Sequence, residues 1–311
     1  MPRSELNLDD FARLFGTPAS QIPPACEELI GLGNFEYEVL RGSERDQVLS
    51  DTVGRIESGT FSLAGPEGKS RWERGWAENR DALLAGEHEA SALVPRYIRP
   101  AAPLRLDQEF ILAADPQFEL NWYVILRKWL SETYLSRFDA IYEFGCGSGF
   151  NLAELAGQYP RKTYLGLDWA QPSVDIINEL GRRHGWDMHG KLFDFFSPDV
   201  TVEFPPNSVV LTIGALEQTG QNFLPFLDFL LASKPSMVIH IEPIVEWYDR
   251  TNVIDDAAIR FHAKRKYWMG YPAALDALND RRKIEILKKK RSYFGSQFIE
   301  GYSQLIWRPL A

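Results

Sequence analysis

An acidic residue followed by three alternating glycines is the feature of this sequence with the clearest chemistry. Glu143 ends an apolar run, Gly145, Gly147 and Gly149 follow at every second position, and a helical pattern begins directly afterwards. Glycine permits a positive φ and lets a ligand lie where a Cβ would collide with it. The N-terminus of a helix directs N–H groups at a carboxylate or phosphate. The pattern therefore predicts a ligand-binding turn between a strand and a helix.

The spacing of these glycines distinguishes two kinds of turn. The dinucleotide fingerprint G-x-G-x-x-G would need a glycine at position 150, where this chain has Phe150, which disfavours NAD-dependent redox chemistry. The pattern present, E-x-G-x-G-x-G, resembles motif I of the class I S-adenosylmethionine (SAM) dependent methyltransferases. The resemblance covers about residues 120–311. It implies that Glu143 and the backbone of the turn hold the methionine part of SAM.

Three further positions match that resemblance in chain order. Asp168 ends the next apolar run, and in the family an acid there accepts hydrogen bonds from the ribose hydroxyls, while Trp169 would lie against the adenine. Asp194 and Phe195 lie near the end of the third run, where the family often has an acid for the adenine amino group and an apolar neighbour for the base. Glu217 ends the fourth run, at the edge that faces the donor methyl group. Read without the family, Asp168 could be a helix N-cap and Asp194 could cap a loop.

The candidate catalytic residues follow the fourth and fifth apolar runs, because ligands of open α/β sheets bind at the carboxyl ends of the strands. Methyl transfer from a sulfonium requires an aligned acceptor and, for a hydroxyl, removal of its proton. Glu242 lies at the tip of the fifth run, whereas His240, two residues earlier, is predicted to be a core histidine. Glu242, Tyr248 and His262 form the candidate catalytic set, and each could instead be a structural hydrogen-bonding residue.

The segment after the fifth run is basic, although the whole chain has a net charge of -9. Between positions 250 and 291, twelve Lys or Arg residues stand against five Asp or Glu residues. A solvated basic face is the simpler interpretation. Alternatively, Arg265, which shares a helix face with His262, could hold a carboxylate or phosphate of the acceptor through two parallel hydrogen bonds. Tyr271 and Tyr293 are the other candidate substrate contacts.

Composition excludes several classes of function. A net charge of -9 disfavours general nucleic-acid binding. No apolar run is long enough to span a membrane, and the first ten residues lack the apolar core of a secretory leader. No two-histidine-plus-carboxylate grouping is spaced like a metal site. We therefore expect a soluble cytoplasmic protein without a nucleic-acid or membrane partner and predict no metal-binding residues, while assistance by a metal and self-association stay open.

Alternation of apolar and helical patterns predicts the architecture. Beyond about residue 110, apolar runs alternate with helical ones, which indicates a parallel sheet covered on both faces. Two β-rich runs, 284–293 and 297–307, predict an antiparallel hairpin that turns at 294–296. The fold class is α/β: a doubly wound, seven-stranded, mostly parallel sheet with a C-terminal antiparallel hairpin. The expected strands of the parallel part are 140–145, 163–168, 191–195, 208–216 and 237–243.

The first part of the chain has a different pattern. Residues 1–110 contain many Pro and Gly turns and short helical stretches, one of them behind a possible Asn7 cap and another with Trp72 and Trp76 on one face. We predict a mainly helical accessory or lid region here, and a SAM-binding domain over residues 111–311. The lid is expected to select the acceptor rather than to hold SAM.

These expectations combine into one functional hypothesis. The chain is predicted to be a SAM-dependent methyltransferase that acts on an oxygen or nitrogen of a small-molecule acceptor such as a sugar, natural product or metabolite. After the fourth run the sequence reads Ala215-Leu-Glu-Gln rather than the (Asn/Asp)-Pro-Pro-aromatic tetrad that usually accompanies amino-group methylation of bases and glutamine. A protein methyltransferase and a SAM-binding regulatory module without turnover are the alternatives.

Overall fold

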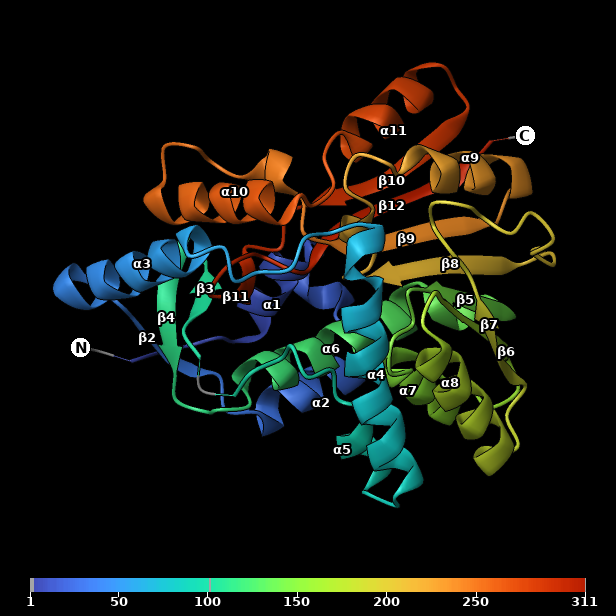
Figure 1. The fold of residues 1–311 in the computed structure, drawn as a ribbon. Helices are drawn as coiled ribbons and strands as arrows, with labels where there is room; N and C mark the ends of the chain where they lie inside the picture. The colour runs from blue at the N-terminus through green and yellow to red at the C-terminus, as the bar shows by residue number, and fades with distance from the viewer. Residues whose placement is uncertain (1–2, 101, 311) are drawn as a thin grey trace.

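A seven-stranded sheet forms the centre of the computed structural model, which describes residues 3–100 and 102–310. The strand order is β10-β12-β9-β8-β5-β6-β7, in which β5 to β9 run parallel and β12 is antiparallel to both β9 and β10 (Figure 1). The predicted fold class is confirmed. The strands are β5 (Ala140–Phe144), β6 (Thr163–Asp168), β7 (Met188–Leu192), β8 (Ser208–Ile213), β9 (Met237–Glu242), β10 (Ile284–Lys290) and β12 (Ser303–Pro309).

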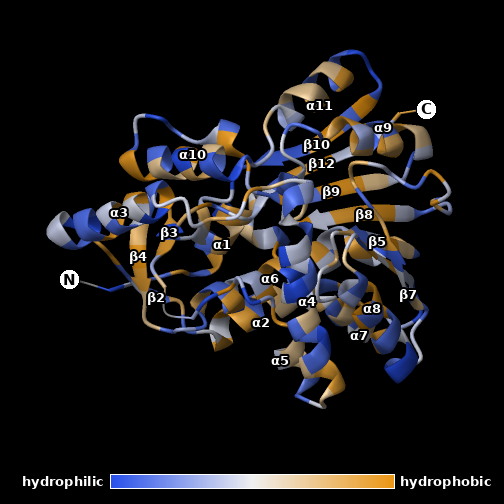
Figure 2. Ribbon diagram, viewed as in Figure 1, coloured by the Kyte–Doolittle hydropathy of each residue, from blue (hydrophilic) through white to orange (hydrophobic). Residues whose placement is uncertain are grey.

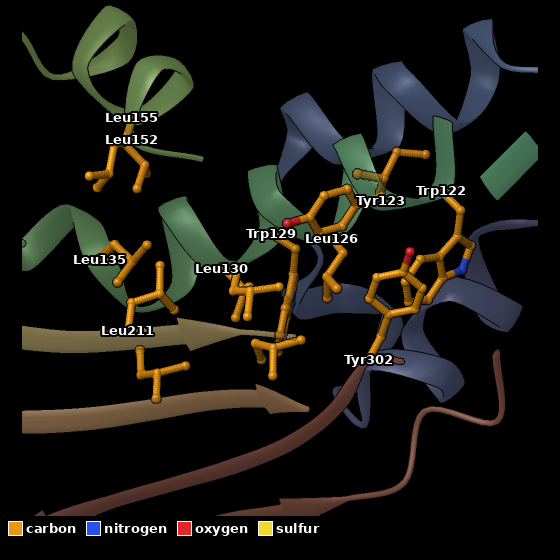
Figure 3. Close-up of a cluster of buried hydrophobic side chains, with 14 of the residues drawn as sticks. Trp122, Tyr123, Leu126, Trp129, Leu130, Leu135, Leu152, Leu155, Leu211 and Tyr302 are labelled. Carbon is orange, nitrogen blue, oxygen red and sulfur yellow. The ribbon is translucent and has the colours of Figure 1, made fainter. Parts of the chain in front are cut away.

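Helices cover both faces of this sheet, whose central strands are buried throughout and largely apolar. All residues of β5, β8 and β9 are buried, and the ribbon of β8 and β9 is largely hydrophobic (Figure 2). One face packs against α6 (Phe118–Thr133), α7 (Phe150–Gln158) and α8 (Gln171–His184), and the other against α9 (Leu224–Ser233) and α11 (Tyr271–Asp280). Figure 3 shows side chains of α6 and α7 packed above Leu211 of β8.

The N-terminal region contains helices and a second sheet that sequence analysis did not predict. The helices are α1 (Leu8–Phe15), α2 (Pro24–Leu32), α3 (Gly42–Glu57), α4 (Lys69–Leu84) and α5 (Glu89–Leu93). The predicted Asn7 cap of α1 is confirmed, since its side chain accepts from the N–H groups of Asp9 and Asp10. The second sheet has the order β1-β2-β4-β3-β11. Its strands are β1 (Ser4–Glu5), β2 (Glu36–Val39), β3 (Leu104–Leu106), β4 (Glu109–Ala113) and β11 (Phe294–Ser296).

The predicted turn of the C-terminal hairpin is wrong. Residues Phe294–Ser296 form strand β11, which pairs antiparallel with β3 of the second sheet. The hairpin strands β10 and β12 do pair with each other, but the connection between them leaves the central sheet and extends the N-terminal one. The sequence pattern gave no sign of this, because the partner strand lies almost two hundred residues away.

One hydrophobic core crosses the predicted boundary near residue 110. Phe15 of α1 lies against Trp122 and Trp129 of α6, with ring centroids 5.5 and 5.0 Å apart, and β4 itself spans the boundary. The last helix that positions the site, α10 (Val253–Arg265), follows β9 and contacts α3. In the described part of the chain, no helix is both long and apolar enough to cross a membrane.

Candidate functional site

A pocket opens at the carboxyl ends of the parallel strands, beside helix α4. We call it the strand-edge pocket. Its walls come from the glycine turn after β5, the end of β6, the loops after β7 and β8, and one face of α4. The lining residues are Trp72, Trp76, Gly145, Asp168, Trp169, Phe193, Phe195, Phe196, Gly214, Ala215 and Gln218. Most of this surface is aromatic, and Asp168 is its one carboxylate.

The three glycines of the predicted turn all adopt positive φ, at +72°, +53° and +73°. A Cβ on Gly145 would lie 2.3 Å from the Cβ of Ala215, and a Cβ on Gly147 would lie 2.7 Å from the indole of Trp76. Gly149 is the N-cap of α7 and packs against Ile177 of α8. Of these three glycines, only Gly145 lines the pocket. Gly147 is covered by Trp76, and Gly149 lies where α7 begins and packs against α8.

Asp168 lies at the tip of β6 and is buried, with its carboxylate on the pocket wall. One oxygen accepts the N–H of Gly147 and the other accepts the N–H of Ala170, both at 2.9 Å. Each carboxylate oxygen can accept a second hydrogen bond, so the side chain can bind hydroxyl groups as well. Burial raises the pKa of Asp168 to about 6, against the opposing effect of the backbone N–H groups.

Glu143 is buried beneath the turn and does not line the strand-edge pocket. Its Oε1 accepts a hydrogen bond from Asn151 at 2.6 Å, whereas its Oε2 has no partner among the described residues. Burial raises the pKa of Glu143 to about 8. An unpartnered buried carboxylate oxygen is costly, and a cationic or N–H donor would satisfy it.

The acids predicted at the third and fourth strands differ in their positions. Asp194 is exposed and lies outside the pocket lining; its Oδ1 accepts the N–H of Phe196 at 2.9 Å, as in the loop-cap alternative. Its neighbour Phe195 does line the pocket. Glu217 is buried in the turn after β8, where Oε1 accepts from Gln218 at 2.8 Å and Oε2 has no partner among the described residues.

Glu242, predicted to be catalytic, is fully buried at the end of β9 and lies outside the pocket lining. Its carboxylate accepts from the Thr212 hydroxyl at 2.7 Å and from the N–H groups of Ala215 and Leu216 at 3.1 Å each. It thus holds the turn that carries Ala215 and Gln218 to the pocket. Burial and the neighbouring Glu217 raise the pKa of Glu242 well above its usual range.

The structure brings the other two candidate catalytic residues, Tyr248 and His262, together, with ring centroids 5.9 Å apart. The Tyr248 hydroxyl accepts the N–H of Glu300 at 2.9 Å. Both ring nitrogens of His262 are buried without a hydrogen-bond partner among the described residues. Burial, followed by the charges of Arg105 and Arg265, lowers the pKa of His262 to about 3. Neither residue lines the strand-edge pocket.

The candidate substrate contacts have three different environments. Tyr271 is fully buried and its hydroxyl pairs with Nε2 of His240 at 2.8 Å, so this structure gives Tyr271 a core role. His240 also bonds Thr212 at 2.9 Å, which confirms the predicted core histidine. Tyr293 is only partly buried, with the Arg291 guanidinium 4.4 Å from its ring centroid. Arg265 is buried at the end of α10.

Sequence analysis missed the contribution of α4 to the pocket. Trp72 and Trp76 are stacked, with centroids 5.6 Å apart, and both line the pocket. Beyond α4, the Leu93 carbonyl accepts the hydroxyl of Ser148 in the glycine turn at 2.6 Å. Residues of the 1–110 region thus form part of the pocket wall, while their selection of the acceptor stays a prediction. The signal was the four-residue spacing of the tryptophans, which places them on one helix face but does not say what that face covers.

Comparison with known proteins gives structural likeness at low sequence identity. No protein-family model matches the chain, and no curated protein matches it significantly. Among solved structures, it is similar to the 16S rRNA methyltransferase RmtF in complex with S-adenosyl-L-homocysteine, at 12% identity over 97% of this chain and 96% of that one, with a TM-score of 0.44. It is also similar to the dimethyltransferase RosA from Streptomyces davawensis, at 13% identity over 99% and 90%, with a TM-score of 0.42.

A third similar structure is the [4+2]-cyclase SpnF, at 13% identity over 81% of this chain and 98% of that one, with a TM-score of 0.49. The topology of the sheet describes the fold better than these low sequence identities do. Five parallel strands, an antiparallel terminal hairpin and a glycine turn after β5 occur together, with an acid at the tip of β6. These features are the ones that the resemblance to the class I SAM-dependent methyltransferases predicts.

Proposed function

We propose that this chain is a SAM-dependent methyltransferase that methylates an oxygen or nitrogen of a small-molecule acceptor. The observation that carries the proposal is Asp168, a buried carboxylate on the wall of an aromatic pocket that adjoins a glycine turn. Aromatic walls suit a purine, and a carboxylate with spare acceptor capacity suits a ribose. When bound, SAM supplies a methyl group on a sulfonium.

The residues of the site fit such a cofactor. Phe195 and Trp169 would pack against the base, Asp168 would accept from the ribose hydroxyls, and Glu143 would pair with the amino group of the methionine part. The unpartnered Oε2 of Glu143 supports the last assignment, because it needs a donor that the described residues do not provide. Asp194, which is exposed and caps a loop, is left out of this set.

Glu217 is the candidate proton acceptor that this geometry favours. It is buried in the turn after β8, next to the pocket residue Gln218, and its Oε2 has no partner among the described residues. Glu242, by contrast, directs its carboxylate at a hydroxyl and at backbone N–H groups. We therefore assign Glu242 to positioning the turn and Glu217 to accepting the proton of a hydroxyl acceptor.

The proposed acceptor class, a small molecule, rests on the net charge of the chain and on the lining of the pocket. A net charge of -9 disfavours a nucleic acid, whose phosphates require clustered cations. The pocket is framed by aromatic residues, of which Phe193 is buried and the others are partly buried, and α4 forms one of its walls, which suits a small molecule better than an extended polymer.

Calorimetry with SAM on two matched variants tests the proposal. Asp168→Asn should weaken SAM binding by about 2–4 kcal/mol, because hydrogen bonds to charged groups contribute about 1.5–3 kcal/mol each and are not additive. Asp194→Asn, an exposed acid outside the pocket, should leave the affinity within about twofold. Unchanged affinity in Asp168→Asn, with an unchanged melting temperature, would refute the site.

Turnover needs a separate readout. Release of S-adenosylhomocysteine in the presence of candidate acceptors should be detected for the wild type and lost in Glu217→Gln at unchanged SAM affinity. Binding of SAM without release for any small molecule, protein or RNA acceptor would favour a regulatory module instead.

A further inference from the structure

Arg265 is a buried cation that pairs with no carboxylate among the described residues. Its side chain is 5% exposed, its Nε has no hydrogen-bond partner, and no hydrogen bond or ion pair within residues 3–100 and 102–310 reaches its guanidinium. The other buried arginines of the described chain, Arg105, Arg127 and Arg291, each pair with a carboxylate. Removing a charge from water without a counter-charge is unfavourable by several kcal/mol. The environment of Arg265 is therefore incomplete in the protein alone.

The side chain of Arg265 is nevertheless held in place. Its guanidinium lies 4.8 Å from the ring centroid of Tyr267 and 5.8 Å from that of Phe261. Stacking on aromatic faces leaves the in-plane N–H groups of a guanidinium free to donate. The arrangement orients the donors without using them, which is what recognition of an oxyanion requires.

A second cation lies near the first. Arg71 of α4 donates to the hydroxyl of Ser62 and pairs with no carboxylate in the described part of the chain. Ser62 lies two residues before Ala64, whose N–H donates to the carbonyl of Arg265, so the two arginines lie on linked segments. Partial desolvation, and then the charge of Arg265, lowers the pKa of Arg71. Arg71 is more exposed than Arg265, so the pair provides one guanidinium at the rim and one inside. Two neighbouring cations without a carboxylate partner among the described residues favour an anion between them.

Backbone hydrogen bonds fix this pair beside the strand-edge pocket. The N–H of Ala64 donates to the carbonyl of Arg265 at 2.7 Å, and the N–H of Gly65 donates to the carbonyl of Gln218 at 2.8 Å. Gln218 lines the pocket, as does Trp72, the residue after Arg71. The cations thus adjoin the wall of the pocket that carries the turn after β8.

We propose that Arg265 and Arg71 bind an oxyanion, a carboxylate or phosphate group, and that the methyl acceptor of this enzyme carries that group. The second half of this statement rests on the proposed methyltransferase function; the anion site itself does not. The acceptor would lie with its anionic end at Arg265 and its reacting atom toward Glu217 and the donor methyl group.

Direct binding to the full chain tests the anion site. Inorganic phosphate and acetate are titrated separately, and binding is followed by the melting temperature and by calorimetry. At least one of the two probes should raise the melting temperature of the wild type, and the stronger probe identifies the group. Arg265→Gln should lose about tenfold or more in affinity for it. The matched control is Arg260→Gln on the same helix, an exposed arginine paired with Asp256, which should bind as the wild type does.

The melting temperature measured without added anions provides an independent test. Because Arg265→Gln removes an unpaired buried charge, it should melt at or above the wild-type temperature in anion-poor buffer, whereas a purely structural arginine would melt lower when replaced. If Arg265→Gln does not fold, Arg71→Gln at the rim gives the same binding comparison. The proposal is overturned if neither probe binds the wild type, or if both arginine variants bind as tightly as the wild type does.

The measurement also separates this proposal from the methyltransferase assignment. SAM affinity of Arg265→Gln should equal that of the wild type, while KM for an anionic acceptor rises. If the wild type binds phosphate or acetate but not SAM, the anion site is supported and the methyltransferase assignment is refuted. If the wild type methylates a neutral acceptor and binds neither probe, the methyltransferase assignment is supported and the anion site is refuted.

Discussion

The two buried carboxylates near the glycine turn differ in how their oxygens are used. Both oxygens of Asp168 accept backbone N–H groups, whereas one oxygen of Glu143 has no partner in the described residues. Burial raises both pKa values, to about 6 for Asp168 and about 8 for Glu143. Near pH 7 the free protein therefore holds a proton on Glu143, and a bound cation would release it.

The affinity for SAM should depend on pH through the ionisation of Glu143. Pairing with an ammonium needs ionised Glu143, whose pKa is about 8, so the affinity should rise as the pH is raised toward 8. Below that pH, calorimetry in two buffers of different ionisation enthalpy should show proton release on binding. Glu143→Gln should bind SAM more weakly and should lack the proton release that comes from Glu143. The proton release that this variant still shows measures the titration of SAM itself. Identical release by the wild type and Glu143→Gln would contradict the assignment.

At the scale of elements, α4 is the N-terminal element that closes the pocket. Its indoles line one wall, and Trp76 covers Gly147. Asn79 of α4 donates to the carbonyl of Ala92 at 2.7 Å, which joins α4 to the segment whose Leu93 carbonyl holds the glycine turn. These hydrogen bonds therefore link the helix, through residues 92–93, to the turn as one packed unit.

Gly147→Val should disrupt this unit. The residue has φ +53°, and a Cβ would lie 2.7 Å from Trp76, so we expect about 1–3 kcal/mol of backbone strain plus displacement of the indole. Urea unfolding and SAM calorimetry should both show losses. In a Trp76→Ala background, Gly147→Val should cost less, because only the strain remains. Gly157→Ala, in α7 with open space around it, is the control and should stabilise the fold by about 0.4–1 kcal/mol. Equal costs in both backgrounds would show that Trp76 does not cover the turn.

A buried ion network connects three further elements. Asp255 of α10 pairs with Arg105 of β3 and with Arg291 after β10, and Arg291 also pairs with Glu300 before β12. These four side chains are almost inaccessible to solvent. The network ties the second sheet to α10, the helix that carries Arg265.

Arg291→Met should cost about 3–5 kcal/mol of folding free energy, since it leaves Asp255 and Glu300 facing a single arginine. Arg308→Met provides the comparison. Arg308 pairs with Glu285 at the surface, where both side chains are about half exposed, and its loss should cost less than about 1 kcal/mol. Urea unfolding of the two variants measures the difference. Similar costs would mean that the buried network adds no more than a surface pair.

At the scale of the whole molecule, the two sheets share residues of one core. β11 from the C-terminal connection completes the N-terminal sheet, and Phe15 packs against tryptophans of α6. If residues 1–110 only select the acceptor, as the sequence predicts, their removal should leave much of SAM binding intact. In this fold, however, removal takes away the α4 wall of the pocket and exposes Trp122 and Trp129, which are fully buried.

A polypeptide of residues 115–311 should therefore not fold cooperatively. Thermal melts followed by circular dichroism should show no sharp transition, and calorimetry should show no SAM binding. Co-expression with residues 1–114 should restore a soluble complex, because the apolar surface is buried again. A shortened chain with a sharp transition and wild-type SAM affinity would instead support an independent domain over residues 111–311.

The sequence alone determined those features that local patterns encode. Apolar runs long enough for buried strands, separated by helical periods, predicted the central sheet, and the hairpin strands β10 and β12 were recognisable from their β-rich runs. The glycine turn and Asp168 were placed correctly because both follow directly from the ends of predicted strands. Each of these inferences needs only residues that are neighbours in the chain.

The tertiary structure decided which side chains meet, because such contacts depend on packing between distant segments. Residues 294–296 look like a turn until β3 is present beside them, and Trp72 and Trp76 look like core residues of a helix until that helix lies on the pocket. Glu242 and Arg265 were both reasonable site residues by position. Only the fold reveals that backbone N–H groups already occupy the carboxylate of Glu242, while no partner reaches Arg265 in the described chain. The sequence shows which charged residues a protein has, whereas the folded structure determines which of them pair.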